Sequence, residues 1–352
     1  MACRLARKAA GRTSPNPIVG AVLVRGGEIV GTGYHRVAGG DHAEIIALKQ
    51  AGAKARGATL YITLEPCSHH GRTPPCSDAL IRAGIKEVIV GMKDPNPLVA
   101  GRGFQQLRRA GIKVRLGLCE AECHLLLEAF EKFITRRVPF VTLKLAATLD
   151  GKIATASGDS RWVSGGDSRT WVQRWRNETD AVVVGAGTVR MDDPQLTCRL
   201  AGGRNPYRVV LDSRLRIPLS SQVLHQNDRD KTIVATTAKA SAAKSRAIES
   251  LGAQVWRMPA RANRVDWRPL LKRLAAQGIV NVLIEGGATV AASALQNKVV
   301  DKIQFFYAPK ILGGDGRVMI DGLGIRKMAR TIPLQRFDVR RSGSDILVSG
   351  YL

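Results

Sequence analysis

The sequence predicts two α/β domains joined in one chain, and three observations support this fold class. The chain has 352 residues, which is too long for one ordinary hydrophobic core and suits two. β-Branched runs alternate with segments of helical apolar spacing up to residue 136, and the same alternation restarts at Phe140. Because Pro139 breaks the pattern between the two halves, we expect domains at residues 1–138 and 139–352.

The first domain is expected to open with two antiparallel strands. Residues 18–24 and 29–34 are β-branched runs separated by Arg-Gly-Gly-Glu, which is a hairpin pattern. The later elements alternate, so helices should cover a sheet. In chain order they are a helix at 42–51, a strand at 59–64, a helix at 76–83, a strand at 86–91, a helix at 101–110, a strand at 112–116 and a helix at 120–136.

The second domain is expected to repeat this alternation and to close with antiparallel strands. Its strands are predicted at 140–145 and near 180–184, 207–211, 231–235 and 279–284, with helices between them. The last part of the chain is strand-rich, at 302–309 and 337–352, and contains the turn sequence Gly-Gly-Asp-Gly at 313–316. These features predict a closing antiparallel edge.

Composition places the chain among globular proteins of the cytosol. Apolar residues make up 45% and charged residues 24%, and no window approaches the ~18 to 20 apolar residues that a membrane span needs. The basic N-terminal segment lacks the apolar stretch of a signal peptide. Six cysteines are too few for a disulfide framework, and in a reducing compartment paired cysteines suggest a metal site.

The formal net charge of +25 could indicate nucleic acid, a membrane surface or small phosphorylated ligands as partners. The basic residues are scattered along the whole chain, mostly singly or in pairs, with no block of five or six. This distribution argues against a polyanion-docking tail. Small anionic ligands are therefore the expected partners, although they leave part of the charge unexplained.

Four residues of the first domain form the pattern of a catalytic zinc site. His42 and Glu44 open a predicted helix, Cys67 follows a predicted strand, and Cys76 opens the next helix. One imidazole and two thiolates are three zinc ligands, and the fourth tetrahedral position stays open for water, whose pKa zinc lowers toward ~7. Glu44 lies two residues from His42 and points elsewhere, so we expect it to shuttle protons, as the glutamate of the H-x-E motif does in zinc deaminases.

A loop of eight residues, SHHGRTPP, separates the two cysteines, where zinc deaminases commonly have two residues. We expect the loop to cross the mouth of the pocket, where His69, His70 and Arg72 could contact a polar or phosphorylated substrate. Two other interpretations are a structural zinc site with His69 or His70 as fourth ligand, and two buried thiols with an unrelated histidine. Cys119 and Cys123 are expected to be ordinary core or surface residues.

Several motifs together resemble the fused deaminase/reductase family of riboflavin biosynthesis. The first domain contains TSPNP at 13–17, HAE at 42–44, LEPCSHHGRTPPC at 64–76 and DPNP at 94–97. The second contains KLAATLDGK at 144–152, GAGTVR at 185–190, DDP at 192–194 and EGG at 285–287. The long cysteine loop is highly specific, and the resemblance covers nearly the whole chain except residues 215–275.

The resemblance implies a fold, two reactions and a set of ligands. It implies a cytidine-deaminase-like α/β/α domain followed by a dihydrofolate-reductase-like α/β domain. The family's substrate is a diaminopyrimidinone that carries a 5-phosphoribosylamino group; its ring amine is hydrolysed, and the ribosyl group is then reduced to ribityl with NADPH. One zinc ion per chain, NADPH and small phosphorylated pyrimidines are therefore expected, together with assembly into a homo-oligomer.

Site residues carried over from the family fall into three groups. The deaminase substrate is expected at Asn16, His69, Arg72, Asp94 and Asn96. NADPH is expected at Ala146, Trp162, Thr188, Asp192, Ser213, Gly287, Ala288 and Thr289. The reductase substrate is expected at Ser160, Arg176, Leu196, Arg199 and Glu285.

Physical arguments support part of the reductase assignment. Two predicted strands run into glycines and then into helices, at 181–188 and 280–288, and the exposed backbone amides of such turns suit the phosphates of a dinucleotide. No complete Rossmann fingerprint occurs in the chain. Arg176 and Arg199 are suitable phosphate ligands, Asp192 could assist a proton transfer, and Arg214 could contact the 2′-phosphate of NADPH.

Two rival functions are a deaminase acting on a base in nucleic acid and a non-enzymatic zinc module that binds nucleic acid. The high charge suits the first, but a content of 5% aromatic residues offers few surfaces on which bases could stack. A non-enzymatic zinc module would have no use for Glu44 or for an open coordination position on the zinc ion.

Overall fold

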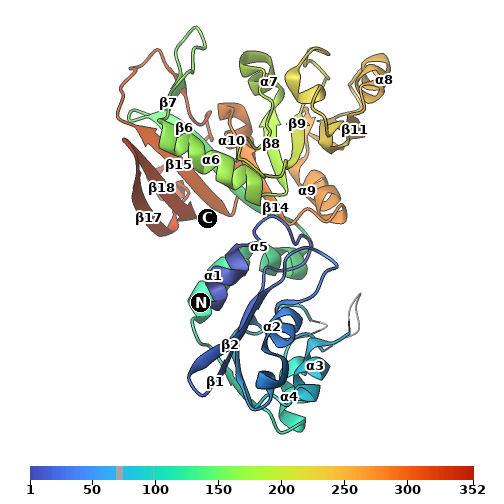
Figure 1. Ribbon diagram of the computed structural model, residues 1–352. Helices are drawn as coiled ribbons and strands as arrows, with labels where there is room; N and C mark the ends of the chain where they lie inside the picture. Colours follow the sequence, from blue (N-terminus) through green and yellow to red (C-terminus); the bar gives the residue numbers. More distant parts are fainter. Residues whose placement is uncertain (69–73, 98) are drawn as a thin grey trace. The chain divides into compact units, whose positions relative to one another are not determined.

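The computed structural model describes residues 1–68, 74–97 and 99–352, which form two units, Met1–Val138 and Pro139–Leu352 (Figure 1). Each unit has its own sheet and its own hydrophobic clusters. The division follows the change of pattern at Pro139.

The first unit contains a five-stranded sheet in the order β2-β1-β3-β4-β5. β1 runs antiparallel to both of its neighbours, whereas β3, β4 and β5 are parallel. The predicted opening hairpin is confirmed, since Arg25 pairs with Glu28 around the glycine turn. The strands span Gly20–Arg25 (β1), Glu28–Tyr34 (β2), Thr59–Leu64 (β3), Glu87–Met92 (β4) and Lys113–Leu116 (β5).

Helices cover both faces of this sheet. One apolar cluster joins the sheet to α2 (Ala43–Ala51), α3 (Cys76–Arg82) and α4 (Arg102–Arg109), and a 3₁₀ turn at Gly52–Ala55 extends α2. Another joins it to α1 (Ala2–Arg7) and α5 (Glu120–Arg136). The predicted helix-covered sheet is confirmed, with α2 to α5 at the four predicted positions, whereas α1 was not predicted. Cys123 lies in the second cluster and Cys119 is exposed, as expected for residues without a catalytic role.

Two glycines of β2 let α2 lie directly against the sheet. A Cβ atom on Gly31 would lie 2.3 Å from the carbonyl oxygen of Ala47, and one on Gly33 would lie 2.2 Å from that of Ala43. Neither distance is compatible with a side chain, so both positions require glycine. This close packing fixes the helix whose first turn carries Glu44.

The second unit is built on a nine-stranded sheet in the order β11-β10-β9-β8-β14-β6-β15-β18-β17. The first seven strands are parallel, and β18 and β17 continue the sheet antiparallel, which confirms the predicted closing edge. The sequence analysis did not predict β11, a four-residue strand in which only Trp256 is buried. The strands are Gln254–Arg257 (β11), Thr232–Thr236 (β10), Tyr207–Leu211 (β9), Ala181–Gly185 (β8), Asn281–Glu285 (β14), Phe140–Thr148 (β6), Lys302–Ala308 (β15), Asp345–Tyr351 (β18) and Gln335–Ser342 (β17).

Two short ribbons accompany the sheet. They pair β12 (Ala260–Arg261) with β13 (Arg264–Val265), and β7 (Lys152–Ala154) with β16 (Arg317–Val318). Short 3₁₀ turns lie at Gln222–Leu224, Arg229–Lys231 and Met328–Arg330.

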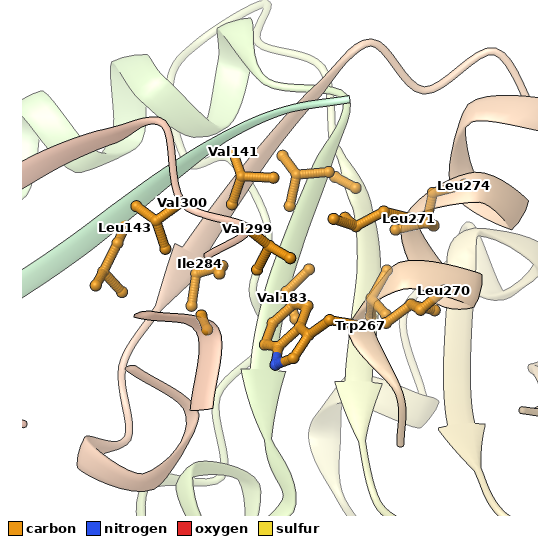
Figure 2. Close-up of a cluster of buried hydrophobic side chains, with 14 of the residues drawn as sticks. Val141, Leu143, Val183, Trp267, Leu270, Leu271, Leu274, Ile284, Val299 and Val300 are labelled. Atoms are coloured by element: carbon orange, nitrogen blue, oxygen red, sulfur yellow. The ribbon is translucent and has the colours of Figure 1, made fainter. Parts of the chain in front are cut away.

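Successive residues of β8 point into two different cores. Val183 belongs to a cluster with α9 (Trp267–Ala276) and α10 (Ala288–Gln296), shown in Figure 2. Its neighbours on β8 belong to a cluster on the opposite face, which includes residues of α7 (Ala186–Asp192) and α8 (Ala242–Ser250) and contacts α6 (Gly166–Glu178). A parallel strand that is buried on both faces has a continuous run of apolar residues in its sequence, and β8 has such a run. The buried indole of Trp267 donates a hydrogen bond to Ser293 Oγ at 3.1 Å.

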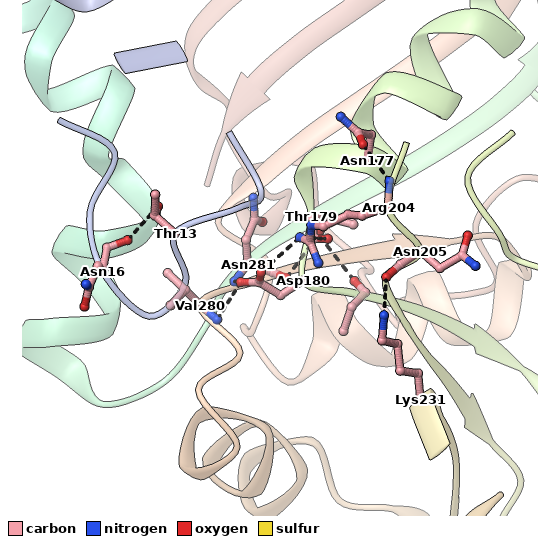
Figure 3. Close-up of polar contacts among 11 residues, drawn as sticks. Thr13, Asn16, Asn177, Thr179, Asp180, Arg204, Asn205, Lys231, Val280 and Asn281 are labelled. Carbon is pink, nitrogen blue, oxygen red and sulfur yellow. Dashed lines mark hydrogen bonds and ion pairs between the residues drawn. The ribbon is translucent and has the colours of Figure 1, made fainter. Parts of the chain in front are cut away.

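A polar network fixes the amino ends of three central strands (Figure 3). Asp180 Oδ2 accepts hydrogen bonds from the amides of Val280 and Asn281 at 2.9 and 3.1 Å, and its backbone carbonyl accepts one from Tyr207. Arg204 Nη2 donates to Asp180 Oδ1 and to the carbonyl of Thr179. The start of β14 and the start of β9 are thus both tied to the residue before β8, so these three strands are aligned at one edge.

The longest helix, α5, has 17 residues and carries charged residues along its length. Within residues 1–68, 74–97 and 99–352, no helix combines the length and the apolar character needed to cross a membrane.

Candidate active sites

The predicted zinc ligands meet at one end of the first sheet. His42 immediately precedes α2, Cys67 follows β3, and Cys76 is the first residue of α3. His42 Nδ1 lies 3.2 Å from Cys76 Sγ and 3.6 Å from Cys67 Sγ, and the ligand atoms of the three residues all lie within 4.8 Å of one another. Segments 34 residues apart in the sequence therefore converge on one point.

The chemistry of these donors fits zinc. One imidazole nitrogen and two sulfur atoms are typical zinc ligands, and the described residues offer no fourth His, Cys, Asp or Glu in the group. A hydrogen bond from Cys76 lowers the pKa of the Cys67 thiol, and the same contact together with burial raises the pKa of Cys76. Two adjacent thiolates repel each other, and a divalent cation would relieve that repulsion.

Glu44 lies beside the same three residues without being one of the ligands. Its side chain is buried, with 3% exposure, and burial raises its pKa to about 7, with the charge of Cys67 adding to the effect. A carboxyl group with a pKa near neutrality can both accept and release a proton at the working pH of an enzyme. This property suits the proton shuttle expected from the sequence.

A histidine that the sequence analysis did not identify connects Asn16 to the zinc ligands. His35 is 2% exposed, its Nε2 lies 3.2 Å from Asn16 Nδ2, and its Nδ1 lies 3.0 Å from the carbonyl oxygen of Asp41. Its ring packs edge-on against the ring of His42, with centroids 5.2 Å apart. Thr13 Oγ1 donates to the carbonyl of Asn16 and holds that turn (Figure 3). The sequence signal that could have identified His35 is its position directly after the predicted strand that ends at Tyr34.

Asp94 and Asn96 lie on the loop after β4, on the side of the sheet where Cys67 follows β3. Asp94 is 8% exposed, and burial raises its pKa to about 6, with a smaller effect from the nearby Cys67. Asp94 Oδ1 accepts a hydrogen bond from the amide of Asn96 at 2.8 Å. The buried carboxylate of Glu65 holds the neighbouring loop by accepting from the amides of Asp94, Gly101 and Gly103.

Two predicted substrate ligands, His69 and Arg72, lie outside the described residues, as does His70. Their expected contacts therefore stay predictions. The same applies to the alternative of a structural zinc site with one of these histidines as fourth ligand.

One cavity of about 1210 Å³ in the second unit brings together all the residues predicted for its two ligands. They come from segments spread over more than 140 positions of the sequence. The lining includes the expected NADPH residues Ala146, Trp162, Thr188, Asp192, Ser213, Gly287, Ala288 and Thr289, and the expected substrate residues Ser160, Arg176, Leu196, Arg199 and Glu285.

The cavity lies at the carboxyl ends of parallel strands, where ligands of open α/β sheets commonly bind. Both predicted strand–glycine–helix turns are present: Gly185 ends β8 directly before α7, and Gly286 and Gly287 connect β14 to α10. The last two have φ angles of +86° and +80°, which glycine adopts without strain. A Cβ atom on Gly287 would lie 3.3 Å from Thr188 Oγ1, so the two turns face each other.

Two residues that line the cavity, Arg176 and Glu285, form a buried ion pair. Arg176 Nε and Nη2 donate to the two carboxylate oxygens of Glu285 at 2.7 and 2.9 Å, and Nη1 donates to the carbonyl of Thr197 at 3.0 Å. The side chains are only 11% and 8% exposed. The guanidinium group of Arg176, which was expected to bind a phosphate, is thus paired with the carboxylate of Glu285. The sequence did not indicate this ion pair.

Lys144 also lines the cavity, and the sequence analysis did not select it as a site residue. Burial lowers its pKa, although the nearby Glu285 opposes the effect. A lysine inside the apolar run of β6 was the signal that could have identified it. Glu285 therefore has the cations Arg176 and Lys144 near it, and the charge of Arg199 also acts on it.

Other predicted residues make local contacts at the rim. Ser160 Oγ lies 3.4 Å from Asp192 Oδ1, and Thr289 Oγ1 donates to Asp321 at 2.6 Å. Trp162 is 60% exposed, so its ring is accessible. Ser213 Oγ accepts a hydrogen bond from the amide of Val265 at 3.2 Å, which ties the loop after β9 to β13.

Comparison with family models assigns both halves of the chain. Residues 1–92 match the cytidine and deoxycytidylate deaminase zinc-binding region, which includes His42, Glu44, Cys67 and Cys76. Residues 139–348 match the RibD C-terminal domain, and this range contains the whole cavity. The two matches agree with the two units of the fold and with the domain types that the resemblance implied.

Relatives and solved structures match over nearly the entire chain. Riboflavin biosynthesis protein RibD of Aquifex aeolicus is 45% identical, covering 99% of this chain and 96% of its own length, and that of Escherichia coli strain K12 is 40% identical, covering 98% and 96%. The structure of Acinetobacter baumannii RibD superposes with a TM-score of 0.90 at 39% identity, covering 99% and 96%.

A Thermotoga maritima structure described as a diaminohydroxyphosphoribosylaminopyrimidine deaminase/5-amino-6-(5-phosphoribosylamino)uracil reductase superposes with a TM-score of 0.87 at 40% identity, covering 99% of this chain and 96% of that one. Similarity of this extent includes both units and both candidate sites. The chain therefore belongs to the RibD family, the bifunctional deaminase/reductases of riboflavin biosynthesis.

Proposed function

We propose that the first unit, residues 1–138, deaminates 2,5-diamino-6-(5-phosphoribosylamino)pyrimidin-4(3H)-one, and that the second, residues 139–352, reduces the ribosyl group of the product to ribityl with NADPH. The observation that carries the proposal is that, among the described residues, a group of three zinc donors, His42, Cys67 and Cys76, lies beside a buried glutamate in the first unit, while the second unit has a cavity at its strand ends. Small phosphorylated pyrimidines are the substrates that RibD function implies. A cytosolic location and assembly into a homo-oligomer stay predictions.

In the deaminase unit, His42, Cys67 and Cys76 would hold zinc, which supplies a water of lowered pKa when bound. Glu44 accepts the proton of the attacking water and delivers protons to the ring nitrogen and the leaving amine. The carbon–nitrogen bond to the amine breaks, a carbonyl forms, and ammonia leaves. Asn16, Asp94 and Asn96 would hold the pyrimidine, with Asn16 oriented by His35.

In the reductase unit, bound NADPH would supply the hydride. Glu285 and Lys144 present a fixed acceptor and donor at the strand ends, and Arg176 holds the Glu285 carboxylate in place. Asp192, whose carboxylate is near Ser160, is proposed to assist the accompanying proton transfer. Reduction adds one hydride and one proton to the sugar and opens the ribosyl group to ribityl.

The test uses the purified full chain and the phosphoribosylamino diaminopyrimidine, with and without NADPH. Ammonia should appear without NADPH, and absorbance at the nicotinamide band should fall only after deamination. A Glu44→Gln variant should lose the first step and still oxidise NADPH when given the deaminated compound. If zinc-loaded wild-type protein releases no ammonia, the substrate assignment is wrong, and deamination of a base in nucleic acid becomes the next hypothesis.

A further inference from the structure

Helix α4 contacts the segment that carries the first of the two zinc-donor cysteines. The buried carboxylate of Glu65 accepts hydrogen bonds from the amides of Gly101 and Gly103, at the start of α4, at 2.9 and 3.0 Å. Glu65 lies two residues before Cys67, in the segment that follows β3. A Cβ atom on Gly103 would lie 2.3 Å from the carbonyl oxygen of Pro66, so the start of α4 lies directly against this segment.

The same helix is joined through Gln106 to the first turn of α3, which carries the second cysteine. Gln106 Nε2 donates a hydrogen bond to the carboxylate of Asp78. Because the amide nitrogen faces this acceptor, the amide oxygen is directed at Ser77, whose hydroxyl donates to Gln106 Oε1 at 2.7 Å. Ser77 is fully buried and directly follows Cys76, the first residue of α3. Helix α4 therefore contacts both cysteine-bearing segments.

The first turn of α3 in turn holds Cys67. The amide of Cys76 donates a hydrogen bond to Cys67 Sγ at 3.3 Å, and the amide of Ser77 donates one to the carbonyl oxygen of Cys67 at 3.1 Å. Hydrogen bonds from residues that are not themselves ligands orient the ligands of a metal. The position of Cys67 therefore depends on the position of the α3 turn, which Gln106 holds from the side of α4.

The spacing of the cysteines explains why such contacts are needed. In a zinc deaminase with two residues between the cysteines, a single backbone turn sets the positions of both sulfur atoms. Here eight residues separate Cys67 from Cys76. A longer loop costs more conformational entropy to close, and in general it constrains the distance between its ends less. The contacts made by Glu65, Ser77 and Gln106 lie at the two ends of this loop, so they fix the two cysteines independently of the residues between them.

We propose that Gln106 is a positioning residue of the zinc site, which keeps the sulfur atoms of Cys67 and Cys76 at the separation that zinc requires. It acts through Ser77 rather than by binding the metal. This inference rests on the proposed zinc-dependent deaminase function and adds a residue of α4 to that site. Residues that orient metal ligands in this way typically contribute about 10- to 100-fold to metal affinity.

The experiment measures the rate at which the zinc-loaded full chain transfers zinc to an excess of a colorimetric chelator. Gln106→Leu removes both side-chain hydrogen bonds and keeps a side chain of similar size. We expect this variant to transfer zinc about 10- to 100-fold faster than the wild type, because weaker binding appears mainly as faster dissociation. Ser77→Ala removes the same contact with a smaller change in volume. It should also speed the transfer, and it provides the test if Gln106→Leu does not fold.

Gln105 provides a matched control on the same helix. Its side chain is exposed, whereas that of Gln106 is partly buried. Gln105→Leu makes the same chemical change and should transfer zinc at the wild-type rate. An equal acceleration in both variants would mean that any such change in α4 loosens the metal, and the inference would be wrong.

Cobalt substitution separates positioning from a general loss of stability. The visible absorption bands of Co²⁺ depend on the geometry of its ligands, whereas a protein that is only less stable binds the ion in unchanged geometry once the site is saturated. We expect Gln106→Leu to shift or weaken these bands at saturating Co²⁺, and Gln105→Leu to retain them. Faster zinc transfer with a wild-type cobalt spectrum would show a loss of stability alone, and would overturn the inference.

The failure of this inference and the failure of the deaminase proposal give different results. If Gln106→Leu and Ser77→Ala both transfer zinc within about threefold of the wild-type rate and keep its cobalt spectrum, the contact does not position the ligands and the inference falls alone. If the wild-type chain takes up no zinc, the deaminase proposal falls and this inference falls with it.

Discussion

The Arg176–Glu285 pair gives a quantitative test of how the reductase cavity is built. Its two hydrogen bonds of 2.7 and 2.9 Å join side chains that are 11% and 8% exposed. Removing one partner of a buried pair leaves an uncompensated charge and costs roughly 3–5 kcal/mol. We expect Arg176→Met to lower the free energy of unfolding of the second unit by about 3 kcal/mol, the low end, because Lys144 still faces Glu285.

Neutralising both partners should be far less harmful than neutralising one. The double variant Arg176→Met/Glu285→Gln leaves no unpaired charge from the pair, so we expect it to be within about 2 kcal/mol of the wild type. The coupling energy from the double-mutant cycle should then be at least about 2 kcal/mol. For a domain of this size, the Arg176→Met variant should melt roughly 10 °C lower.

The pair should also depend on pH in a defined direction. Burial raises the pKa of Glu285, but the charge and hydrogen bonds of Arg176, with Lys144 adding, outweigh burial, so the pKa lies below its ordinary value. A carboxyl group whose folded pKa is lowered stabilises the protein above its unfolded pKa of about 4.3, and the effect is lost as pH falls through the folded value. The stability difference between wild type and Glu285→Gln should be constant from about pH 6 to 8 and shrink below about pH 5.

The distribution of tryptophans makes the measurement selective. All five lie in the second unit, at positions 162, 171, 175, 256 and 267, and the first unit has none. Denaturant titration followed by tryptophan fluorescence therefore reports unfolding of the reductase unit within the full chain, where a two-state analysis of the whole protein would not hold. A coupling energy near zero, or a double variant as unstable as the sum of the single variants, would refute this account of the ion pair.

Three other changes test separate features. Glu44→Gln should retain one zinc per chain by metal analysis and lose about 10²- to 10⁴-fold in ammonia release, because only the proton shuttle is removed; loss of zinc would contradict this role. Gly33→Ala should destabilise the first unit by about 2 kcal/mol through overpacking against Ala43 and speed zinc transfer to a competing chelator. An unchanged rate of zinc transfer would mean that the close packing of α2 on β2 is not needed to hold the zinc ligands. Asp180→Ala should destabilise the second unit by about 2 kcal/mol while NADPH affinity is kept, since Asp180 binds backbone amides at the strand ends opposite the cavity; a large loss of affinity would show that the two edges are coupled.

Much of the deaminase site could be predicted because its chemistry is concentrated in short motifs. His42, Glu44, Cys67 and Cys76 are recognisable as donors and a proton shuttle from residue type and spacing, and the structure brings the three donors within 4.8 Å. His35 could not be predicted in the same way. Its role depends on a contact between Asn16 and the residue that follows β2, and side-chain hydrogen bonds between distant segments leave no periodic signal.

The sequence by itself determined the two α/β domains, the opening hairpin, the antiparallel closing edge and the candidate zinc donors, because local periodicity and donor chemistry are properties of short segments. Only the tertiary structure decided the strand order β9-β8-β14-β6, and with it the joining of residues from Ala146 to Thr289 in one cavity. It also decided that Arg176 binds Glu285, whereas Arg214 and Arg264 line the cavity and their guanidinium groups pair with none of the described residues. The physical reason is that an arginine's role depends on which carboxylate the fold places within reach, and parallel strands bring together residues that are far apart in the chain.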